Sequence, residues 1–170
     1  ILAGFSVCTG KCATVKTADC QEPAELILDM YESWKRGNRV VLAVRTDREE
    51  SAFQKAFASF YYWLVRKMAI SSMPKGGFDC YLIDRKVIEV LTRLDEANSA
   101  LTLQVLWAGF RRDVVYYVRK KREKGRSRWT FGKKIKLILD SSISFSFVPI
   151  RIASVTGILF FVAAVVWGIV

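Results

Sequence analysis

The sequence predicts an α/β fold that leads into a membrane-spanning helix, and three observations carry this prediction. Short apolar segments rich in β-branched residues alternate with amphipathic helical segments through most of the chain. Basic residues gather in the C-terminal part, where they precede a long segment without any charge. With 170 residues, the chain has the size of one ordinary domain with an appendage.

The first elements form a strand–helix–strand unit. We expect a short helix closed by Thr9-Gly10, a buried strand over Cys12 to Thr17, a helix from Pro23 to about Arg36 and a strand over Arg39 to Val44. Such a run normally gives a parallel strand pair with a right-handed crossover. The sequence therefore predicts a mostly parallel sheet with flanking helices.

The later elements continue this alternation. Helices are expected over about Ser51–Met68, from Asp84 onward and over Ala97–Phe110, with a short strand after Asp79 and another over Val114–Val118. Asp84 can accept hydrogen bonds from the first turn of its helix, so it is the expected N-cap.

The C-terminal segment predicts a transmembrane helix. No charged residue stands between Ile152 and Val170, and at about 1.5 Å per residue this segment nearly crosses a hydrocarbon core of ~30 Å. A buried core helix is the alternative, but core helices normally keep a polar stripe. Residues 131–151 form the juxtamembrane part, in which Phe131 to about Ile143 suits an amphipathic interfacial helix.

The charge balance favours a membrane surface as partner. Lys and Arg number 27 against 16 Asp and Glu, which gives a net charge of +11. Nucleic acid or a phosphate-bearing substrate would also suit this charge. The basic clusters at Arg119–Arg128 and Lys133–Lys136 lie just before the span, however, so we expect no nucleic-acid partner. The positive-inside rule places this side of the cell membrane in the cytoplasm.

The four cysteines predict no metal site. Cys8, Cys12, Cys20 and Cys80 do not have the spacing of a zinc knuckle, and the chain has no histidine. We expect reduced thiols that pack as small hydrophobic side chains.

Two aspartates are the candidate catalytic residues. Asp19 follows the first predicted strand, and ligands of open α/β sheets bind outside the carboxyl ends of strands. A carboxylate there can hold a divalent metal that neutralises a diphosphate leaving group, although a helix cap is an equal alternative. Asp79 follows the glycine pair Gly76-Gly77, and its carboxylate suits a base or an electrostatic partner of the nucleophile. Turn formation alone is the alternative for this run.

Basic residues form a third candidate group. Arg45 and Arg48 follow the second predicted strand, and a basic loop runs from Arg119 to Trp129. Arginine side chains and a serine hydroxyl suit phosphate oxygens. The alternative is a solvated loop that is attracted to the membrane, and both readings can hold together.

Six segments in order resemble the family-two glycosyltransferases of GT-A fold that act on polyprenyl phosphates, such as dolichol-phosphate mannosyltransferases and bactoprenol glucosyltransferases. They are TADCQEPAELI (Thr17–Ile27), AVRTDREES (Ala43–Ser51), GGFDCYLIDRKV (Gly76–Val87), LWAGF (Leu106–Phe110), REKGRSRW (Arg122–Trp129) and SFSFVPIR (Ser144–Arg151). The resemblance implies a partial GT-A (Rossmann-like) catalytic domain over residues 1–130 and a transmembrane helix over residues 152–170.

The same resemblance implies the chemistry. Asp19 would coordinate Mg²⁺ or Mn²⁺, Asp79 would serve as base near the acceptor, and phosphate would be bound by Arg45, Arg48, Arg122, Ser127 and Arg128. The expected reaction moves a sugar from a nucleotide-sugar donor to polyprenyl phosphate at the cytoplasmic face of the inner membrane, in the biogenesis of a cell-wall or surface glycan. A homo-oligomer is left open.

Departures from the family pattern keep two rivals open. Thr17 stands where many members have the first aspartate of the metal motif, and the first nucleotide-binding strands and the second membrane helix are missing. We therefore expect the chain to continue naturally and to be inactive alone. One rival is a non-catalytic, membrane-anchored relative that binds lipid phosphate. The other is a processive polysaccharide synthase, which is weaker because Gly125 stands where its QxxRW motif needs glutamine.

Overall fold

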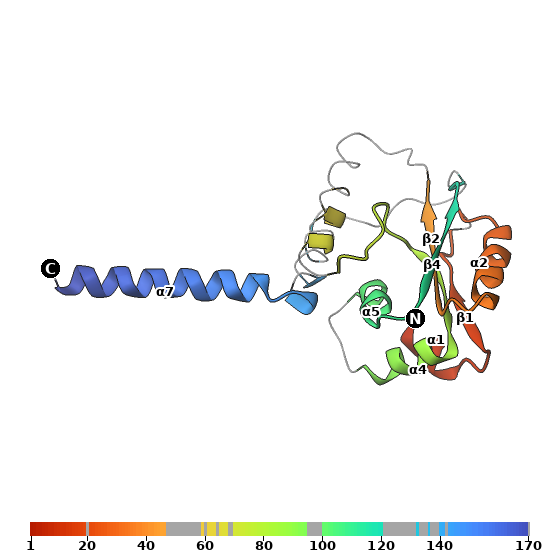
Figure 1. Ribbon diagram of the computed structural model, residues 1–170, viewed down its shortest axis with the longest axis horizontal. Helices are drawn as coiled ribbons and strands as arrows, with labels where there is room; N and C mark the ends of the chain where they lie inside the picture. Colours follow the sequence, from red (N-terminus) through yellow and green to blue (C-terminus); the bar gives the residue numbers. More distant parts are fainter. Residues whose placement is uncertain are drawn as a thin grey trace.

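A computed structural model gives the structure of the chain. It describes residues 1–19, 21–46, 59, 61–63, 65–67, 70–94, 100–120, 132, 136, 140–141 and 143–169. In this part of the chain, an α/β unit is followed by one long helix that projects away from it (Figure 1). The predicted α/β class is confirmed.

Four strands form one mixed sheet. They are β1 (Cys12–Val15), β2 (Val40–Arg45), β3 (Cys80–Asp84) and β4 (Arg112–Tyr117), in the spatial order β1-β3-β2-β4. Strand β3 is antiparallel to both of its neighbours, whereas β2 and β4 are parallel.

The prediction that the first two strands are neighbours in a mostly parallel sheet was therefore wrong. Strands β1 and β2 do run in the same direction, but β3 lies between them. The chain returns to the sheet at the end where β2 finishes, because Gly76 lies against Val44 and Cys80 is in register with Ala43. A strand that starts there has to run back along β2, and so it is antiparallel.

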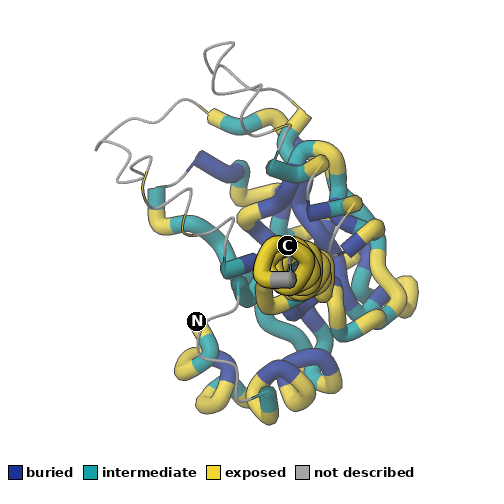
Figure 2. Tube along the Cα trace, turned by 90° about the vertical axis from the view of Figure 1, so that its left-hand side faces the viewer, coloured by how far each residue is buried: buried dark blue, intermediate teal, exposed yellow. Residues whose placement is uncertain are grey.

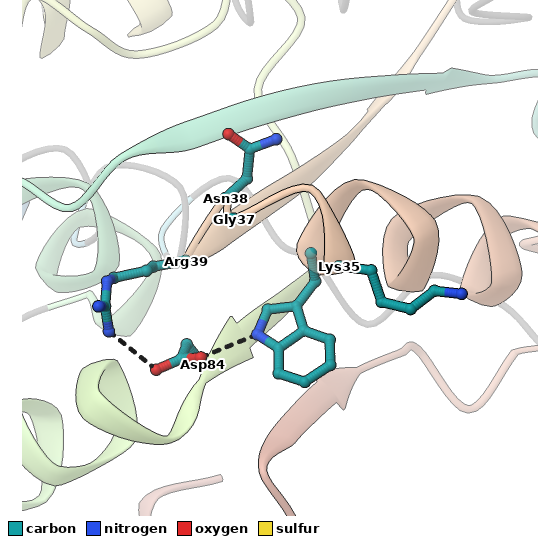
Figure 3. A pocket seen from close by; sticks show the side chains of 6 residues that line it. Lys35, Gly37, Asn38, Arg39 and Asp84 are labelled. Atoms are coloured by element: carbon teal, nitrogen blue, oxygen red, sulfur yellow. Dashed lines mark hydrogen bonds and ion pairs between the residues drawn. The ribbon is translucent and has the colours of Figure 1, made fainter.

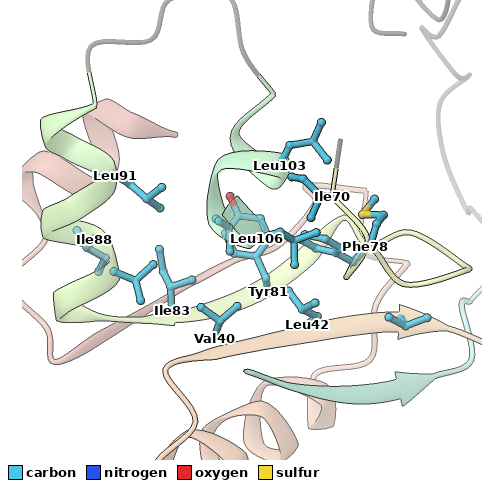
Figure 4. Packing of buried hydrophobic residues seen from close by; sticks show 14 of the residues in the cluster. Val40, Leu42, Ile70, Phe78, Tyr81, Ile83, Ile88, Leu91, Leu103 and Leu106 are labelled. Carbon is cyan, nitrogen blue, oxygen red and sulfur yellow. The ribbon is translucent and has the colours of Figure 1, made fainter. Parts of the chain in front are cut away.

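Helices cover both faces of the sheet, which gives three layers. Helix α2 (Glu25–Lys35) covers one face, while α1 (Leu2–Val7), α4 (Arg85–Arg93) and α5 (Leu101–Trp107) lie on the other (Figure 1). Successive residues of β2 alternate between the two layers. Leu42 packs with the cluster of α4 and α5 shown in Figure 4, and Val41 packs with Leu26 and Met30 of α2.

The helix ends follow local chemistry. The Asp84 carboxylate accepts a hydrogen bond from the Lys86 amide at 3.0 Å, so the predicted N-cap is confirmed. Helix α2 stops before Gly37, which has a φ of 93°. The predicted bounds of α2, α5 and β4 were each a few residues off, and α1 ends before Thr9-Gly10 as expected.

The apolar C-terminal segment forms helix α7 (Val148–Ile169). Residues Val148–Gly168 are long and apolar enough to cross a membrane, with a mean hydropathy of 2.1 and none of that stretch buried (Figure 2). The helix begins earlier than the predicted Ile152, and Pro149 lies in its first turn, where a missing N–H is tolerated. The helices predicted over Ser51–Met68 and Phe131–Ile143 are described only in part, and every described residue within those two ranges is helical.

Candidate functional site

Polar side chains from four strands meet at one edge of the sheet. The register pairs Val15 with Tyr81 and Arg45 with Tyr117, so the carboxyl ends of β1, β2 and β4 lie beside the amino end of β3. In Figure 1 this is the edge toward which the β2 and β4 arrows point. Asp19 follows β1 and Asp79 precedes β3. Both aspartates therefore belong to the edge where ligands of such sheets bind.

Asp19 is held by contacts to both of its carboxylate oxygens. Its Oδ1 accepts a hydrogen bond from the Thr17 hydroxyl at 2.7 Å and a longer one from the Gln21 amide at 3.4 Å. Its Oδ2 lies 3.4 Å from Nη2 of Arg119, which follows β4. The side chain of Asp19 is 19% exposed, so it is shielded but can be reached from solvent.

Thr17 links Asp19 to a second carboxylate. The Thr17 hydroxyl also lies 2.7 Å from each carboxylate oxygen of Glu22, a residue that is only 3% exposed. A hydroxyl has one proton, so it donates to one carboxylate at a time. The residue that replaces the first motif aspartate thus positions Asp19, and it brings Glu22 next to it.

Asp79 pairs with Arg45 across the same edge. Nη2 of Arg45 lies 3.6 Å from Oδ2 of Asp79, and the Asp79 side chain is 48% exposed while Arg45 is mostly buried. Asp79 therefore presents its carboxylate to solvent beside a fixed positive charge. The structure brings together the predicted site residues Asp19, Asp79 and Arg45 at one edge.

The glycine pair before Asp79 has a packing role. Gly77 has a φ of 65°, which favours glycine, and a Cβ there would overlap the ring of Tyr62. At Gly77 the backbone therefore lies close to a tyrosine of the same chain. This packing helps to fix the segment that carries Asp79.

Two hydrogen bonds join the residues that follow β4 to the segment that carries Asp19. The Lys120 amide donates to the Gln21 carbonyl at 2.9 Å, and the Gln21 side-chain amide donates to the Lys120 carbonyl at 3.0 Å. Sequence reasoning placed Arg119 in the basic loop without a role of its own, and it gave none to Glu22. Two signals in the sequence could have found them: Arg119 comes directly after a predicted strand, and Glu22 lies close to Asp19 along the chain.

Burial and nearby carboxylates shift two pKa values at this edge. Burial raises the pKa of the Cys80 thiol to about 11, and Glu22 adds to the rise. Burial, followed by Glu22 and Asp79, raises the pKa of Tyr117 to about 12. At neutral pH the Cys80 thiol is protonated and the Tyr117 phenol is neutral. Cys80 is thus an inert packing residue, as expected for these cysteines.

Several predicted site residues lie outside the described residues. They are Arg48, Arg122, Ser127 and Arg128, together with Cys20. Their roles stay predictions.

The donor set at Asp19 suits a cation that also binds the substrate. Within the described ranges, no group of three or more His, Cys, Asp or Glu residues is close enough to hold a metal ion. Mg²⁺ is commonly bound by one or two carboxylates together with substrate phosphates, rather than by a cage of protein ligands. The partly exposed Asp19 carboxylate, at a sheet edge that also carries arginines, fits that mode.

A hollow of about 330 Å³ lies at the opposite end of the sheet (Figure 3). Asp84 is one of the residues that line it, and its carboxylate accepts hydrogen bonds from Trp34 Nε1 at 2.9 Å and from Arg39 Nη1 at 3.2 Å. Both carboxylate oxygens are used to join α2, β2 and α4. This hollow is a structural junction, so the edge with Asp19 and Asp79 is the candidate site.

The comparisons with known proteins point to glycosyltransferases. No family model matches the chain. An uncharacterized glycosyltransferase of Bacillus subtilis, YkcC, is 41% identical over 160 residues, which are 94% of this chain and 50% of the relative. The bactoprenol glucosyl transferase of Shigella phage SfX is 32% identical over 166 residues, 97% of this chain and 54% of the relative.

A third relative agrees with these two. The prophage bactoprenol glucosyl transferase homolog of Escherichia coli is 30% identical over 169 residues, 99% of this chain and 55% of the relative. The matches cover almost all of this chain, and the chain spans about half the length of the curated relatives it matches. The chain is therefore homologous, over most of its own length, to proteins named as glycosyltransferases, among them bactoprenol glucosyl transferases.

Proposed function

We propose that this chain is the acceptor-side half of a glycosyltransferase that moves a sugar from a nucleotide-sugar donor to polyprenyl phosphate. The observation that carries this proposal is the meeting of Asp19, Asp79 and Arg45 at one sheet edge in a chain that continues into a helix fit to span a membrane. The names of the phage and Escherichia coli relatives, which refer to bactoprenol, support a polyprenyl acceptor. The mixed sheet with helices on both faces is compatible with a partial GT-A domain.

In the proposed reaction, an oxygen of the lipid phosphate attacks the anomeric carbon of the donor sugar. The bond between that carbon and the diphosphate oxygen breaks, and the nucleoside diphosphate leaves with the bonding electrons. When bound, Mg²⁺ or Mn²⁺ supplies positive charge to this leaving group, and Asp19 is the carboxylate that would hold it. The acceptor phosphate is already anionic at neutral pH, so no strong base is needed.

The protein groups then act by charge and position. Arg45 lies at the end of β2, where its guanidinium can bind phosphate oxygens. Asp79 is exposed beside it and can orient the acceptor or the sugar hydroxyls, because a carboxylate accepts hydrogen bonds in a fixed direction. Such positioning is a major source of rate enhancement in group transfer between bound substrates.

The lipid acceptor requires a membrane, and one surface next to α7 suits it. Trp107, Ile143 and Phe147 are 62%, 69% and 78% exposed, and they line a hollow of about 250 Å³ just before the span. Aromatic side chains at the end of a membrane helix favour the lipid–water interface. We place this domain on the cytoplasmic side of the cell membrane, because basic residues are concentrated before the helix.

A single substitution tests this function. In the full-length protein, Asp19→Asn should abolish transfer of labelled sugar to polyprenyl phosphate, because the neutral amide cannot balance a cation or Arg119. Asp29→Asn on the exposed face of α2 is the matched control and should leave transfer unchanged. Turnover like that of the wild type in Asp19→Asn would exclude this site. If the wild type transfers no sugar to lipid phosphate from uridine- or guanosine-diphosphate sugars, the alternative of a non-catalytic relative is favoured.

A further inference from the structure

Arg119 is the positive group that pairs with Asp19 in this structure. Nη2 of Arg119 lies 3.4 Å from Oδ2 of Asp19, and the opposite oxygen, Oδ1, is held by Thr17. The Thr17 hydroxyl therefore contacts one oxygen of Asp19, and the positive charge of Arg119 lies at the other oxygen. A divalent cation at Asp19 would compete with this guanidinium for the same oxygen.

The contacts of Arg119 leave part of its hydrogen-bonding capacity unused. Its Nε atom is buried and makes no hydrogen bond within the part of the chain that the structure describes. A guanidinium has five N–H donors in a planar fork that matches two oxygens of a phosphate. A buried donor without an acceptor is unfavourable, so an oxyanion that reaches Nε and Nη2 together is a better partner than Asp19 alone.

The backbone beside Arg119 is held by hydrogen bonds, whereas part of its side chain is open to solvent. Lys120 is joined to Gln21 by the reciprocal pair of hydrogen bonds, so the start of the Arg119 side chain stays next to the Asp19 loop. The Arg119 side chain is 25% exposed. A change of partner therefore needs rotation of one side chain and no movement of the sheet.

We propose that Arg119 exchanges partners, from Asp19 to the diphosphate of the donor, when the cation and the donor bind together. The inference rests on the proposed function, since it needs a cation at Asp19 and a diphosphate at this edge. Before the exchange, the guanidinium neutralises Asp19 and opposes binding of a cation alone, because two positive groups share one carboxylate oxygen. After the exchange, the diphosphate lies between both positive groups. Cation and donor then bind cooperatively, and each raises the affinity for the other.

The test measures binding of Mn²⁺ rather than activity. Free and bound Mn²⁺ are distinguished by electron paramagnetic resonance in the full-length protein, with and without UDP or GDP as the diphosphate probe. Arg119→Gln should bind Mn²⁺ alone more tightly than the wild type, by about fivefold or more, because the competing charge is gone. The same variant should lose most of the gain in Mn²⁺ affinity that the nucleoside diphosphate gives to the wild type.

Two further variants complete the test. Arg119→Lys keeps the charge but loses the planar fork, so its affinity for Mn²⁺ alone should stay near that of the wild type while the gain from the diphosphate falls. This variant also serves if Arg119→Gln does not fold. Arg93→Gln, at the exposed end of α4, should behave like the wild type in both measurements.

The outcomes separate the inference from the proposed function. The wild type is expected to bind Mn²⁺ more tightly in the presence of a nucleoside diphosphate. If both Arg119 variants have the same Mn²⁺ affinities as the wild type, with and without the diphosphate, Arg119 has only a structural role and the inference is overturned. A loss of Mn²⁺ affinity in Arg119→Gln would also overturn it, because removal of a competing positive charge cannot weaken the binding of Mn²⁺ to Asp19. If the wild type binds no Mn²⁺ under either condition, the proposed cation site itself fails.

Discussion

Arg45 and Asp79 join two strands at the candidate site, with 3.6 Å between Nη2 of the arginine and Oδ2 of the aspartate. The first residue ends β2 and the second precedes β3, so the pair lies where the antiparallel strand begins. The arginine is mostly buried, whereas about half of the aspartate side chain is exposed. The pair therefore holds one carboxylate in a fixed orientation toward solvent.

Asp79→Asn should lower the rate of sugar transfer by about 100-fold in the full-length protein, because a misplacement of bound reacting groups by about 1 Å can cost about 10²-fold in rate. The amide has nearly the same shape, so the fold and the melting temperature should change little. Asp29→Asn is again the control. A rate within twofold of the wild type would show that Asp79 only closes the turn before β3.

Gly77→Ala should destabilise the protein much more than Gly109→Ala. Both glycines have positive φ, 65° and 72°, and a left-handed conformation costs roughly 1–2 kcal/mol for an alanine at either position. Only at Gly77 would the new Cβ overlap another side chain, the ring of Tyr62, which adds about 1–3 kcal/mol of overpacking. Thermal unfolding of the two variants provides the comparison. Equal losses of stability would mean that Tyr62 moves aside at little cost.

Local signals made several parts of the fold predictable. Asp84 lies between an apolar strand and an amphipathic helix, which is the usual place of an N-cap, and the uncharged segment after Arg151 indicates a helix that can span a membrane. The strand order was not predictable in this way. The pairing of Val15 with Tyr81 and of Ala43 with Cys80 joins residues far apart in the chain, and a strand buried on both faces reads alike in parallel and antiparallel pairs.

The same limit applies to the candidate site. Asp19 was predictable because it is a carboxylate that follows a strand, and Asp79 because it is a carboxylate between a glycine pair and a strand. The pairing of Asp19 with Arg119 depends on β4 lying beside β2, which no local pattern contains. Glu22 was missed because a glutamate in the segment before a helix normally faces solvent, whereas this one is buried against the Thr17 hydroxyl.

The free energy of unfolding should fall in alkaline solution, and the ionisation of the Cys80 thiol is the first cause. Its pKa rises from 9.0 to about 11 on folding, so the folded state keeps a proton that the unfolded chain releases. The stabilisation is complete below pH 9 and is lost as the pH rises through 11. Tyr117 acts in the same way from pH 10 to about 12. Cys80→Ala should therefore flatten the pH dependence of the free energy of unfolding between pH 9 and 11, and parallel curves for variant and wild type would contradict the assignment.

A charge in the middle of α7 should prevent membrane insertion, whereas the same charge at its start should not. Ile158 and Ile150 are both exposed on this helix, at 62% and 65%, so Ile158→Arg and Ile150→Arg make the same chemical change at two depths. At the centre of a span, an arginine costs about 2.5–3.5 kcal/mol on insertion scales. Near the end of the helix, beside Arg151, its side chain can reach the headgroups.

An insertion assay on the segment Val148–Gly168, with reporters on either side, measures the inserted fraction directly. The wild-type segment and Ile150→Arg should both span, and Ile158→Arg should reduce the inserted fraction by at least tenfold, since about 1.4 kcal/mol corresponds to a factor of ten. Equal insertion of the two variants would mean that the segment does not cross the bilayer with Ile158 near its centre. In that case α7 would have to bury its apolar surface against protein. The proposal of a lipid acceptor would then lose the structural feature that most directly supports it.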